Sequence, residues 1–435
     1  MTATNNNIII IGGGAGGLEL ACKLGRKFGK DRVTLVDWNL YHVWKPSLHE
    51  VGAGTLDRHQ EGLSYPMLAH DNDFSFVLGA FAGLDAQRNE ITVSAVEGEQ
   101  GDTILPERRL SFSKLCIAVG SVSNHFNTPG AAEHTISLNA PADAERFRIA
   151  LLRQMAQADS RKESEPGAAV EVVIIGGGAT GVELAAELRE ASNAYVSYGF
   201  GRLDPVRDVR ITLLEGAPRI LAPLPERVAR EAARLLKERH VDVVADCRVA
   251  RIEPSRVIDQ AGRVYRSDIC VWAAGIRAPG FLGTLGLPTN RLGQLEVTDR
   301  LNVNGHPHIY ALGDCAACVA GDGQQVPPRA QAAHQQADYL YKAFSRQLQG
   351  RHAPERPYLY RDYGSLVSVG TQTGVGSLMG SLKGLSWFVG GGFARMLYAS
   401  LHLLHHRAVL GWMRTGGLAL ARTLIRRNTA LVKLH

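Results

Sequence analysis

Acidic residues are missing from the end of this chain, because no Asp or Glu follows Asp362 in its 435 residues. Eight Lys and Arg residues do follow it, and they account for more than the whole formal net charge of +6. The basic character is therefore local to the C-terminus and needs a local explanation. These charges alternate with Leu, Trp, Phe and Met, which favours a lipid surface over nucleic acid as their partner.

Three further absences limit the class of protein. No run reaches the ~20 strongly apolar residues that cross a bilayer, so no spanning helix is expected. Residues 1–7 lack the basic and apolar segments of an export signal, which predicts a cytoplasmic chain. The six cysteines show no disulfide-framework spacing, as is typical of a reducing compartment, and the fifteen histidines suggest no metal site.

An internal repeat is the strongest feature that is present. The segment Gly12–Ala21 (GGGAGGLELA) reappears as Gly176–Ala185 (GGGATGVELA). Each copy follows a short apolar run, Ile8–Ile11 or Val172–Ile175, and each precedes a helical pattern. Each therefore predicts a strand, a tight turn and a helix, and the chain as a whole predicts two related α/β units.

The first copy has the chemistry of a dinucleotide site. Gly12, Gly14 and Gly17 would permit a tight turn, close approach to a pyrophosphate, and close packing of the helix on the strand. The phosphates would lie at the helix N-terminus, where free N–H groups and the dipole attract anions. The next strand, Val33–Val36, ends at Asp37, which is placed to bind ribose hydroxyls. A glycine turn of purely structural origin is the alternative.

The second copy repeats this pattern with Gly176, Gly178 and Gly181, and the strand that follows ends at Glu215. An acid there accepts hydrogen bonds from the adenosine 2′-hydroxyl and repels a 2′-phosphate, which favours NADH over NADPH. Arg219 is close enough in sequence to leave NADPH open. Two such sites predict two cofactors, with FAD in the first unit and NADH in the second.

In these motifs the chain resembles the two-dinucleotide-binding flavoprotein reductases, and within them the type II NADH:quinone oxidoreductases. The resemblance covers essentially the whole chain. It implies an α/β fold with two Rossmann-like domains, for FAD and NADH, and a C-terminal amphipathic helical region that binds a membrane. The expected ranges are 1–140 and 280–363 for a discontinuous FAD domain, 141–279 for the NADH domain, and 364–435 for the membrane region. The polar stretch 157–165 is expected to be a flexible connection.

The resemblance also implies site residues. Lys45 lies in Tyr41–Pro46, which looks like the loop beside the flavin ring, and Asp314 matches the aspartate that binds the ribityl and phosphate region. The implied FAD contacts are Gly12, Gly14, Ala15, Gly17, Asp37, Lys45, Val77, Gly313, Asp314 and Ala330. The implied NADH contacts are Gly176, Gly178, Gly181, Glu215 and Gly275.

The segment Ala330–Gln335 (AQAAHQ) is similar to the quinone-site pattern AQxAxQ of that family. Gln331 and Gln335 are four residues apart, so on a helix both amides project from one face. Amides can hydrogen-bond a quinone carbonyl without bringing a charge into an apolar tunnel. Solvated glutamines on a polar helix are the alternative. Lys383 is expected at the entry to the tunnel.

Two further motifs have competing interpretations. Glu183 matches the glutamate that the family places near nicotinamide and flavin, where it would orient the nicotinamide or relay a proton to quinone. Glu19 holds the equivalent place in the first copy, so a shared role at the start of a helix is open. Cys315 and Cys318 form a CxxC motif, for which packing is favoured over a redox or metal pair.

The C-terminal region predicts an amphipathic helix. From Phe393, apolar residues recur along one stripe at Met396, Leu397, Leu401, Leu404, Ala408 and Trp412. Such a helix would lie in the membrane interface, with Tyr398 and the tryptophans in the headgroup layer and the basic residues, among them Arg395, at the edge of the stripe. His402, His405 and His406 are also expected at the interface. A helix buried in a homodimer is the alternative.

Together these features predict an enzyme on the cytoplasmic face of the inner (cell) membrane. It would take a hydride from NADH onto FAD and reduce membrane quinone to quinol without pumping protons. Three alternatives are open: an NADH-dependent reductase of a soluble acceptor, a sulfide:quinone-type oxidoreductase that uses the CxxC cysteines, and an NADH-binding redox sensor with negligible turnover. No nucleic acid is expected as a partner.

Overall fold

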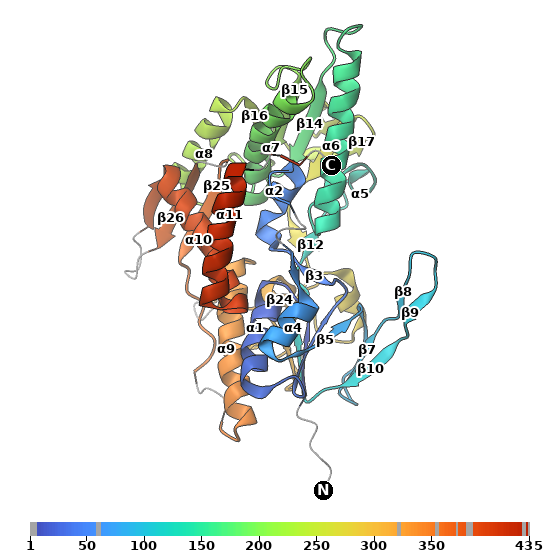
Figure 1. Cartoon of the computed structure of the whole chain (residues 1–435), viewed down its shortest axis with the longest axis vertical. Helices are drawn as coiled ribbons and strands as arrows, with labels where there is room; N and C mark the ends of the chain where they lie inside the picture. Colours follow the sequence, from blue (N-terminus) through green and yellow to red (C-terminus); the bar gives the residue numbers. More distant parts are fainter. Residues whose placement is uncertain are drawn as a thin grey trace.

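The computed structural model describes residues 7–57, 62–319, 323–352, 356–370, 373–379, 386–428 and 432–433, without the side chains of residues 379, 386 and 422–428. Within these residues the chain forms two units built on parallel sheets, followed by a C-terminal region of three strands and two helices (Figure 1). The predicted α/β fold with two Rossmann-like units is confirmed.

The first unit is a five-stranded parallel sheet in the order β23-β11-β1-β2-β5. All four isoleucines of its central strand are buried because both faces of the sheet are covered. Ile8 and Ile10 pack toward the helices, and Ile9 and Ile11 pack toward an antiparallel sheet on the other face. The strands are β1 (Ile8–Ile11), β2 (Val33–Asp37), β5 (Ser75–Leu78), β11 (Lys114–Ile117) and β23 (Ile309–Ala311), and the helices are α1 (Ala15–Phe28), α4 (Tyr65–Asn72) and α9 (Ala330–Leu348).

The second unit repeats this plan in the order β13-β20-β14-β15-β16. Its strands are β13 (Ile136–Ser137), β14 (Val170–Ile175), β15 (Val209–Leu214), β16 (Val241–Val244) and β20 (Ile269–Trp272), and its helices are α6 (Pro141–Arg161), α7 (Ala179–Tyr198) and α8 (Glu226–Glu238). The flexible connection predicted at residues 157–165 is wrong in its first part, because α6 continues through Arg161. The chain instead crosses between the units on two strands that pair with each other, β12 (Val122–Ser123) and β21 (Ile276–Arg277).

Smaller elements complete the two units. Two antiparallel sheets contain β6 (Phe81–Asp85), β7 (Glu90–Val93) and β10 (Arg108–Ser111), and β17 (Val249–Glu253), β18 (Arg256–Asp259) and β19 (Val264–Arg266). The short pairs are β3 (Tyr41–His42) with β4 (Leu63–Ser64), β8 (Val96–Glu97) with β9 (Thr103–Leu105), and β22 (Leu295–Glu296) with β24 (Ala316–Ala317). The short helices are α2 (Leu48–Ala53), α5 (Ala131–His134), η1 (Lys45–Ser47), η2 (Gly280–Thr284) and η3 (Gly313–Cys315).

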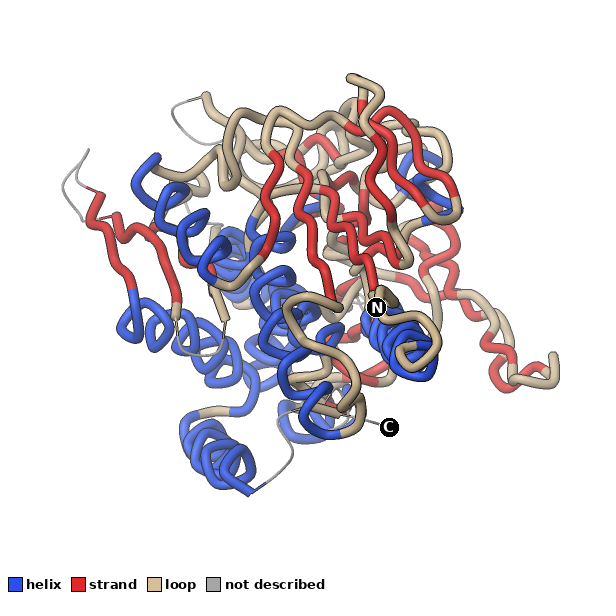
Figure 2. The backbone as a smooth tube through the Cα atoms, turned by 90° about the horizontal axis from the view of Figure 1, so that it is seen from above, coloured by secondary structure: helices blue, strands red, loops and turns tan. Residues whose placement is uncertain are grey.

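The C-terminal region starts with an antiparallel sheet of β25 (Gly364–Ser368), β26 (Gly374–Met379) and β27 (Ser386–Gly390). Two helices follow, α10 (Gly391–Leu410) and α11 (Trp412–Asn428), so the single predicted stripe is divided at Gly411, where φ is +79°. Both helices lie along one side of the molecule (Figure 1). Seen from above, most helices fill the middle and lower left of the molecule, and strands lie on more than one side of them (Figure 2). Among the described helices, none combines the length and the apolar character needed to cross a membrane.

Candidate functional site

The two glycine turns have the same geometry. Gly12 and Gly176 have φ of +96° and +111°, and a Cβ on either would lie 2.6 Å from a backbone atom of the neighbouring strand end. A Cβ on Gly17 or Gly181 would overlap the carbonyl oxygen of the glycine at the start of its own turn. Only glycine fits at these four positions, which is why the sequence repeats them.

Gly14 and Gly178 have a different reason to be glycine. A Cβ on Gly14 would meet only a backbone oxygen at 3.9 Å, and a Cβ on Gly178 would meet nothing within 4 Å. Each is the N-cap of its helix, α1 or α7, and neither helix has a side-chain cap or an acidic residue in its first turn. The open space and the free N–H groups form a cradle that fits the pyrophosphate of a dinucleotide, with Ala15 as the first helical residue of the first cradle.

The predicted acids stand beside these turns. Asp37 accepts a hydrogen bond from the backbone N–H of Gly13 at 2.7 Å, and Glu215 accepts one from that of Gly177 at 2.6 Å. Burial raises the pKa of Asp37, and backbone donors oppose the shift. Val77 pairs with the residue before Asp37, so it borders the same end of the sheet. Both acids therefore lie where a ribose would meet the turn.

The side chain of Arg219 is held by backbone carbonyl groups of the residues that follow it. Its guanidinium donates to the carbonyl oxygens of Leu221, Ala222 and Leu224 at 3.3, 2.7 and 2.9 Å. A 2′-phosphate would have to replace these carbonyl groups as the partner of Arg219, and the nearby carboxylate of Glu215 would repel it. The geometry therefore favours NADH over NADPH in the second unit.

The residues implied for the flavin meet at the carboxyl end of the first sheet. Lys45 Nζ donates to the carbonyl oxygen of Ser121 at 2.7 Å, and Ser121 Oγ donates to Asp314 Oδ2 at 2.7 Å. Burial lowers the pKa of Lys45, and the charge of Asp314 opposes the shift. The N–H of Gly313 donates to Gln336 Oε1 at 2.7 Å, which ties this turn to α9, where Ala330 is the first residue. A pocket beside Asp314 is lined by residues that include Arg277, Leu292, Gln294, Gln325 and Pro328.

Glu183 lies at a junction of three elements. Its side chain is buried on α7 and accepts a hydrogen bond from the backbone N–H of Ser368 in β25 at 3.1 Å. His49 Nδ1, on α2, lies 3.5 Å from the other carboxyl oxygen, and the hydroxyl of Tyr398 on α10 also bonds the carboxyl group. Burial raises the pKa of Glu183, and the charge of His49 opposes the shift. The sequence did not single out His49, whose Nε2 is buried without a partner among the described residues.

Two more carboxyl groups surround this junction. Glu187, one turn further along α7, accepts a hydrogen bond from Thr55 Oγ1 at 2.5 Å, and burial raises its pKa. Glu50 pairs with Arg395 of α10 at 3.1 Å. The junction is therefore a place where carboxyl groups can hold protons away from bulk water.

The two glutamines of the AQxAxQ pattern contact one segment. Gln331 Nε2 lies 3.2 Å from Asp362 Oδ1 and 3.1 Å from the carbonyl oxygen of Gly364, and Gln335 exchanges hydrogen bonds of 2.8 and 2.9 Å with the backbone of Arg361. Both amides thus lie on one face of α9, beside the chain that leads into β25. Lys383 lies outside the described residues.

The remaining motif residues lie in closely packed surroundings. Gly275, with φ of +65°, follows β20, and a Cβ there would overlap the ring of Phe126. Cys315 and Cys318 are buried and unpaired, and burial raises the pKa of their thiols to about 12 and about 11. Little thiolate is present at neutral pH, which supports the packing interpretation over a redox pair. Among the described residues, no group of His, Cys, Asp and Glu is arranged to hold a metal ion.

Several predictions for the inner side of α10 are wrong. His405 and His406 were expected at a membrane interface, yet each is only 2% exposed. Tyr398 and Arg395 also face inward, toward Glu183 and Glu50, instead of toward headgroups or the edge of the stripe. The inward side of this helix is polar because the surfaces that it covers carry buried carboxyl groups.

Two dinucleotide cradles, joined by paired crossing strands and carrying a lysine and an aspartate where a flavin would lie, define the class: a pyridine-nucleotide-linked flavoprotein with two dinucleotide-binding domains. The family model described as pyridine nucleotide-disulphide oxidoreductase matches residues 6–337. A type II NADH:quinone oxidoreductase of Haemophilus influenzae is 36% identical over 99% of this chain and 100% of that protein. One of Staphylococcus aureus is 28% identical over 87% of this chain and 91% of its own length. The chain therefore belongs to the pyridine nucleotide-disulphide oxidoreductases and, within them, to the type II NADH:quinone oxidoreductases.

Solved structures support the fold. The structure of NDH2 from Plasmodium falciparum in complex with NADH matches with a TM-score of 0.81 at 18% identity, over 99% of this chain and 100% of the other. The sulfide:quinone oxidoreductase of Aquifex aeolicus matches with a TM-score of 0.70 at 16% identity, over 98% and 96% of the two chains. At these identities the likeness extends to the fold alone.

Proposed function

We propose that this protein oxidises NADH and reduces a quinone to quinol, with FAD as the carrier between them. The observation that carries this proposal is the pair of open glycine cradles in a chain that is similar along its whole length to type II NADH:quinone oxidoreductases. FAD, when bound, accepts the hydride of NADH and passes the two electrons on. The cradle at Gly14 would hold FAD and that at Gly178 would hold NADH. Lys45 and Asp314 would face the flavin and its ribityl chain.

A proton must also reach the quinone. Two electrons and two protons convert a quinone to a quinol, and the hydride of NADH brings only one of these protons. The second comes from solvent to a site that excludes water. Glu183 is the residue best placed to carry it, because burial favours its protonated form and because His49 and Tyr398 contact its carboxyl group.

Gln331 and Gln335 are the proposed quinone contacts, since their amides border the segment that links α9 to β25. To bind a quinone carbonyl, the Gln331 amide would exchange its bonds to Asp362 and Gly364 for bonds to the substrate. Gln331→Ala is expected to slow reoxidation of the reduced flavin by a short-chain quinone ~10-fold, because one or two hydrogen bonds to the acceptor are lost. Bleaching of the flavin by NADH should stay within ~2-fold of the wild-type rate.

Stopped-flow absorbance measures both half-reactions in the loaded enzyme: NADH is mixed first and quinone is added second. Rapid bleaching followed by rapid reoxidation would support the proposal. Reoxidation by a soluble ferredoxin or disulfide but not by quinone would favour a reductase of soluble acceptors. Reoxidation by quinone of flavin reduced by sulfide would favour the sulfide:quinone type. A lasting reduced complex without turnover would favour a redox sensor. Equal effects of Gln331→Ala on both steps would contradict the assignment of the quinone contact.

We further propose that α10 and α11 bind a lipid surface. Helices of soluble proteins bury their large apolar side chains, but here these side chains point outward. The exposed apolar residues of the two helices are Phe393 (55%), Met396 (59%), Leu401 (45%), Leu404 (46%), Trp412 (76%), Met413 (91%) and Leu420 (64%). An apolar face of this kind, rimmed by basic residues and without an acidic residue in its sequence, suits anionic lipid.

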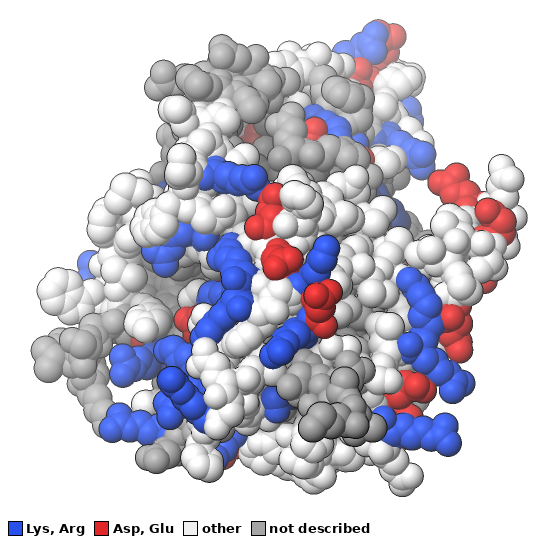
Figure 3. All heavy atoms as spheres, turned by 60° about the horizontal axis from the view of Figure 1, so that its bottom comes forward, with Lys and Arg blue, Asp and Glu red and all other residues white. Residues whose placement is uncertain are grey.

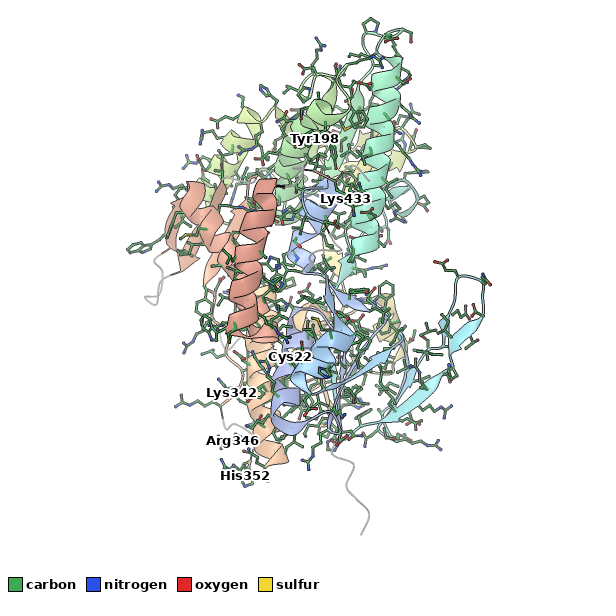
Figure 4. The ribbon with its side chains drawn as sticks, viewed as in Figure 1. Cys22, Tyr198, Lys342, Arg346, His352 and Lys433 are labelled. Atoms are coloured by element: carbon green, nitrogen blue, oxygen red, sulfur yellow. The ribbon has the colours of Figure 1, made fainter. Side chains whose placement is uncertain are left out.

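Basic side chains outside the tail extend this surface. Lys342 and Arg346, one turn apart on α9, are exposed and point away from the body of the molecule on the side that carries α10 and α11 (Figure 4). In the view of Figure 3, Lys and Arg gather at the lower left of the molecule, where few Asp or Glu are visible. Elsewhere on this face, basic and acidic side chains are mixed. The proposed location is the cytoplasmic face of the cell membrane, next to the bilayer in which the quinone is dissolved.

Replacing exposed apolar residues is a sharper test of this surface than truncation, because α10 also carries buried contacts. The double variant Met413→Glu/Leu420→Glu is expected to weaken binding to vesicles of phosphatidylglycerol and phosphatidylcholine at least ~10-fold in a sedimentation assay, since two apolar contacts are lost and two like charges are added. Bleaching by NADH should be unchanged. Ile104→Glu is the control, because Ile104 is 59% exposed but lies on β9, away from the helices (Figure 1).

Equal vesicle binding by the tail double variant and the control would contradict the lipid proposal. If the double variant instead turns a dimer into a monomer without any change in lipid binding, the apolar face serves a second copy of this chain. Sedimentation velocity of the same variants distinguishes this outcome.

A further inference from the structure

A chain of hydrogen bonds links the C-terminal helix to the first glycine turn. His405 on α10 contacts Glu19 Oε1 through Nδ1 at 2.9 Å and His42 Nε2 through Nε2 at 3.0 Å. His42 Nδ1 lies 2.9 Å from the carbonyl oxygen of Gly13, the middle residue of the turn that would hold FAD. His42, Glu19 and His405 are 4%, 2% and 2% exposed, so these bonds are shielded from solvent.

The partners fix the positions of the protons. A carbonyl oxygen can only accept, so His42 Nδ1 carries a hydrogen and donates it to Gly13. Burial and the charge of His405 lower the pKa of His42 to about 3, so His42 is neutral and its Nε2 accepts. His405 Nε2 must therefore donate to His42.

The other nitrogen of His405 faces a carboxylate. Burial raises the pKa of Glu19, but hydrogen bonds from His334 and His405 outweigh burial and lower it to about 2, so the carboxylate is ionised and can only accept. Both ring nitrogens of His405 thus carry hydrogens, and the ring is an imidazolium. The side chain of His42 therefore connects a buried cation on α10 to the turn that would bind the pyrophosphate.

The surroundings hold this imidazolium in place. The ring of Trp44 lies 4.4 Å from the ring of His405, centroid to centroid, and the side chain of Arg26 on α1 donates to the carbonyl oxygen of Val409 on the same helix as His405 at 2.7 Å. The titratable and charged groups that face His405 and its partners are Glu19, Lys23 and Arg26 on α1, His42 on β3, Tyr65 on α4, His334 and Asp338 on α9, and His402 and His406 on α10. Tyr65 also donates to the carbonyl oxygen of Gly13, at 2.8 Å.

We propose that His405 is a positioning residue for FAD: as an imidazolium paired with Glu19, it fixes His42 and thereby the Gly13 carbonyl, so that FAD binding and the docking of α10 stabilise each other. The inference rests on the proposed FAD site in the first unit. The outer side of α10 is the proposed lipid surface, so the same helix would face the membrane on one side and support the cofactor turn on the other. Coupling of this kind is reciprocal, because each binding event favours the state that the other needs.

The test measures the dissociation constant of FAD, by flavin fluorescence, for the deflavinated full chain. His405→Gln keeps a polar side chain of similar size but cannot donate from two sites as a cation, and it is expected to weaken FAD binding ~10-fold or more. His406→Gln is the matched control, because His406 is the next residue and is equally buried at 2%; its FAD affinity should stay within ~2-fold. The double variant His405→Gln/Glu19→Gln should bind FAD no more weakly than the weaker-binding of the two single variants, since both substitutions act through one contact.

A double-variant comparison separates positioning from simple packing. Glu19→Gln alone should weaken FAD binding about as much as His405→Gln, because both variants remove the same contact. Losses that add in the double variant would contradict the positioning role. Equal FAD affinity in His405→Gln and His406→Gln would overturn the inference.

A measurement on the unaltered protein guards against misfolded variants. Hydrogen exchange of the backbone amides of α10 should slow when FAD is added to deflavinated wild-type protein. Unchanged exchange along α10 would also overturn the inference. A chain that binds no FAD at all would instead refute the proposed function, so the two failures are distinguishable.

Discussion

Gly178→Val is expected to give a folded, yellow protein whose flavin is not bleached by NADH. The φ of Gly178 is −72°, which valine adopts, and a Cβ there meets nothing within 4 Å, so the fold should accept the substitution. The added side chain would fill the open space in front of α7 where the pyrophosphate of NADH would lie. The second-order rate constant for bleaching by NADH, measured by stopped-flow absorbance, should fall at least ~100-fold. This fall corresponds to a loss of about 2.7 kcal/mol of transition-state binding.

Gly14→Val is the matched control, because Gly14 has the equivalent position in the first unit, with φ of −68° and a single contact at 3.9 Å. This variant should purify without flavin, whereas Gly178→Val should keep its flavin and be reduced normally by dithionite. In calorimetry, Gly178→Val should unfold within a few degrees of the wild-type protein, and Gly14→Val within a few degrees of deflavinated wild-type protein, because bound FAD stabilises the folded state. The reverse pattern, with flavin lost from Gly178→Val, would show that the two cofactors had been assigned to the wrong units.

The sequence predicts those parts of the fold where the backbone geometry allows only one type of residue. Gly12 and Gly176 adopt a positive φ and almost touch a neighbouring strand, so the motif repeats at both turns. Asp37 and Glu215 end their strands and accept a hydrogen bond from the turn, which is also a local relation. Local rules of this kind need no knowledge of the rest of the fold.

The inner side of α10 shows what such rules miss. Its leucine stripe was predicted, and Leu401 and Leu404 are exposed as a lipid-binding helix requires. Periodicity reveals only that a helix has two faces, so it could not show that the opposite face meets residues hundreds of positions earlier. His405 bonds Glu19 across 386 residues of sequence, and a histidine in a basic tail is more often exposed.

The junction around Glu183 was predicted only in part. Its place two residues after Gly181 pointed to a role, but nothing in the sequence connected it to His49 or Tyr398. His49 lies three residues after Pro46, the end of the segment expected beside the flavin, and that proximity was the one available indication. The contacts themselves depend on how α2, α7 and α10 come together, which no local pattern contains.

Glu183→Gln is expected to slow the formation of quinol ~100-fold and to spare bleaching by NADH, because an amide keeps the shape of the protonated carboxyl but cannot deliver a proton. In the wild-type enzyme, reoxidation by quinone should slow as pH rises through the raised pKa of Glu183, and in the variant it should be slow and nearly independent of pH. Glu187→Gln is the control, since Glu187 is also buried with a raised pKa but contacts Thr55. Equal reoxidation by the two variants would contradict the proton role.

The same substitution has a thermodynamic consequence whose sign is fixed by burial. The folded protein keeps the Glu183 proton at pH values where the unfolded chain, with a pKa of ~4.3, has lost it. The folded state then binds more protons, so the free energy of unfolding falls as pH rises from ~4.3 to the raised pKa of Glu183. Glu183→Gln removes this contribution. Its free energy of unfolding by urea, measured across this range of pH, should therefore fall less steeply than that of the wild type, and a gain in stability relative to the wild type should grow toward the alkaline end.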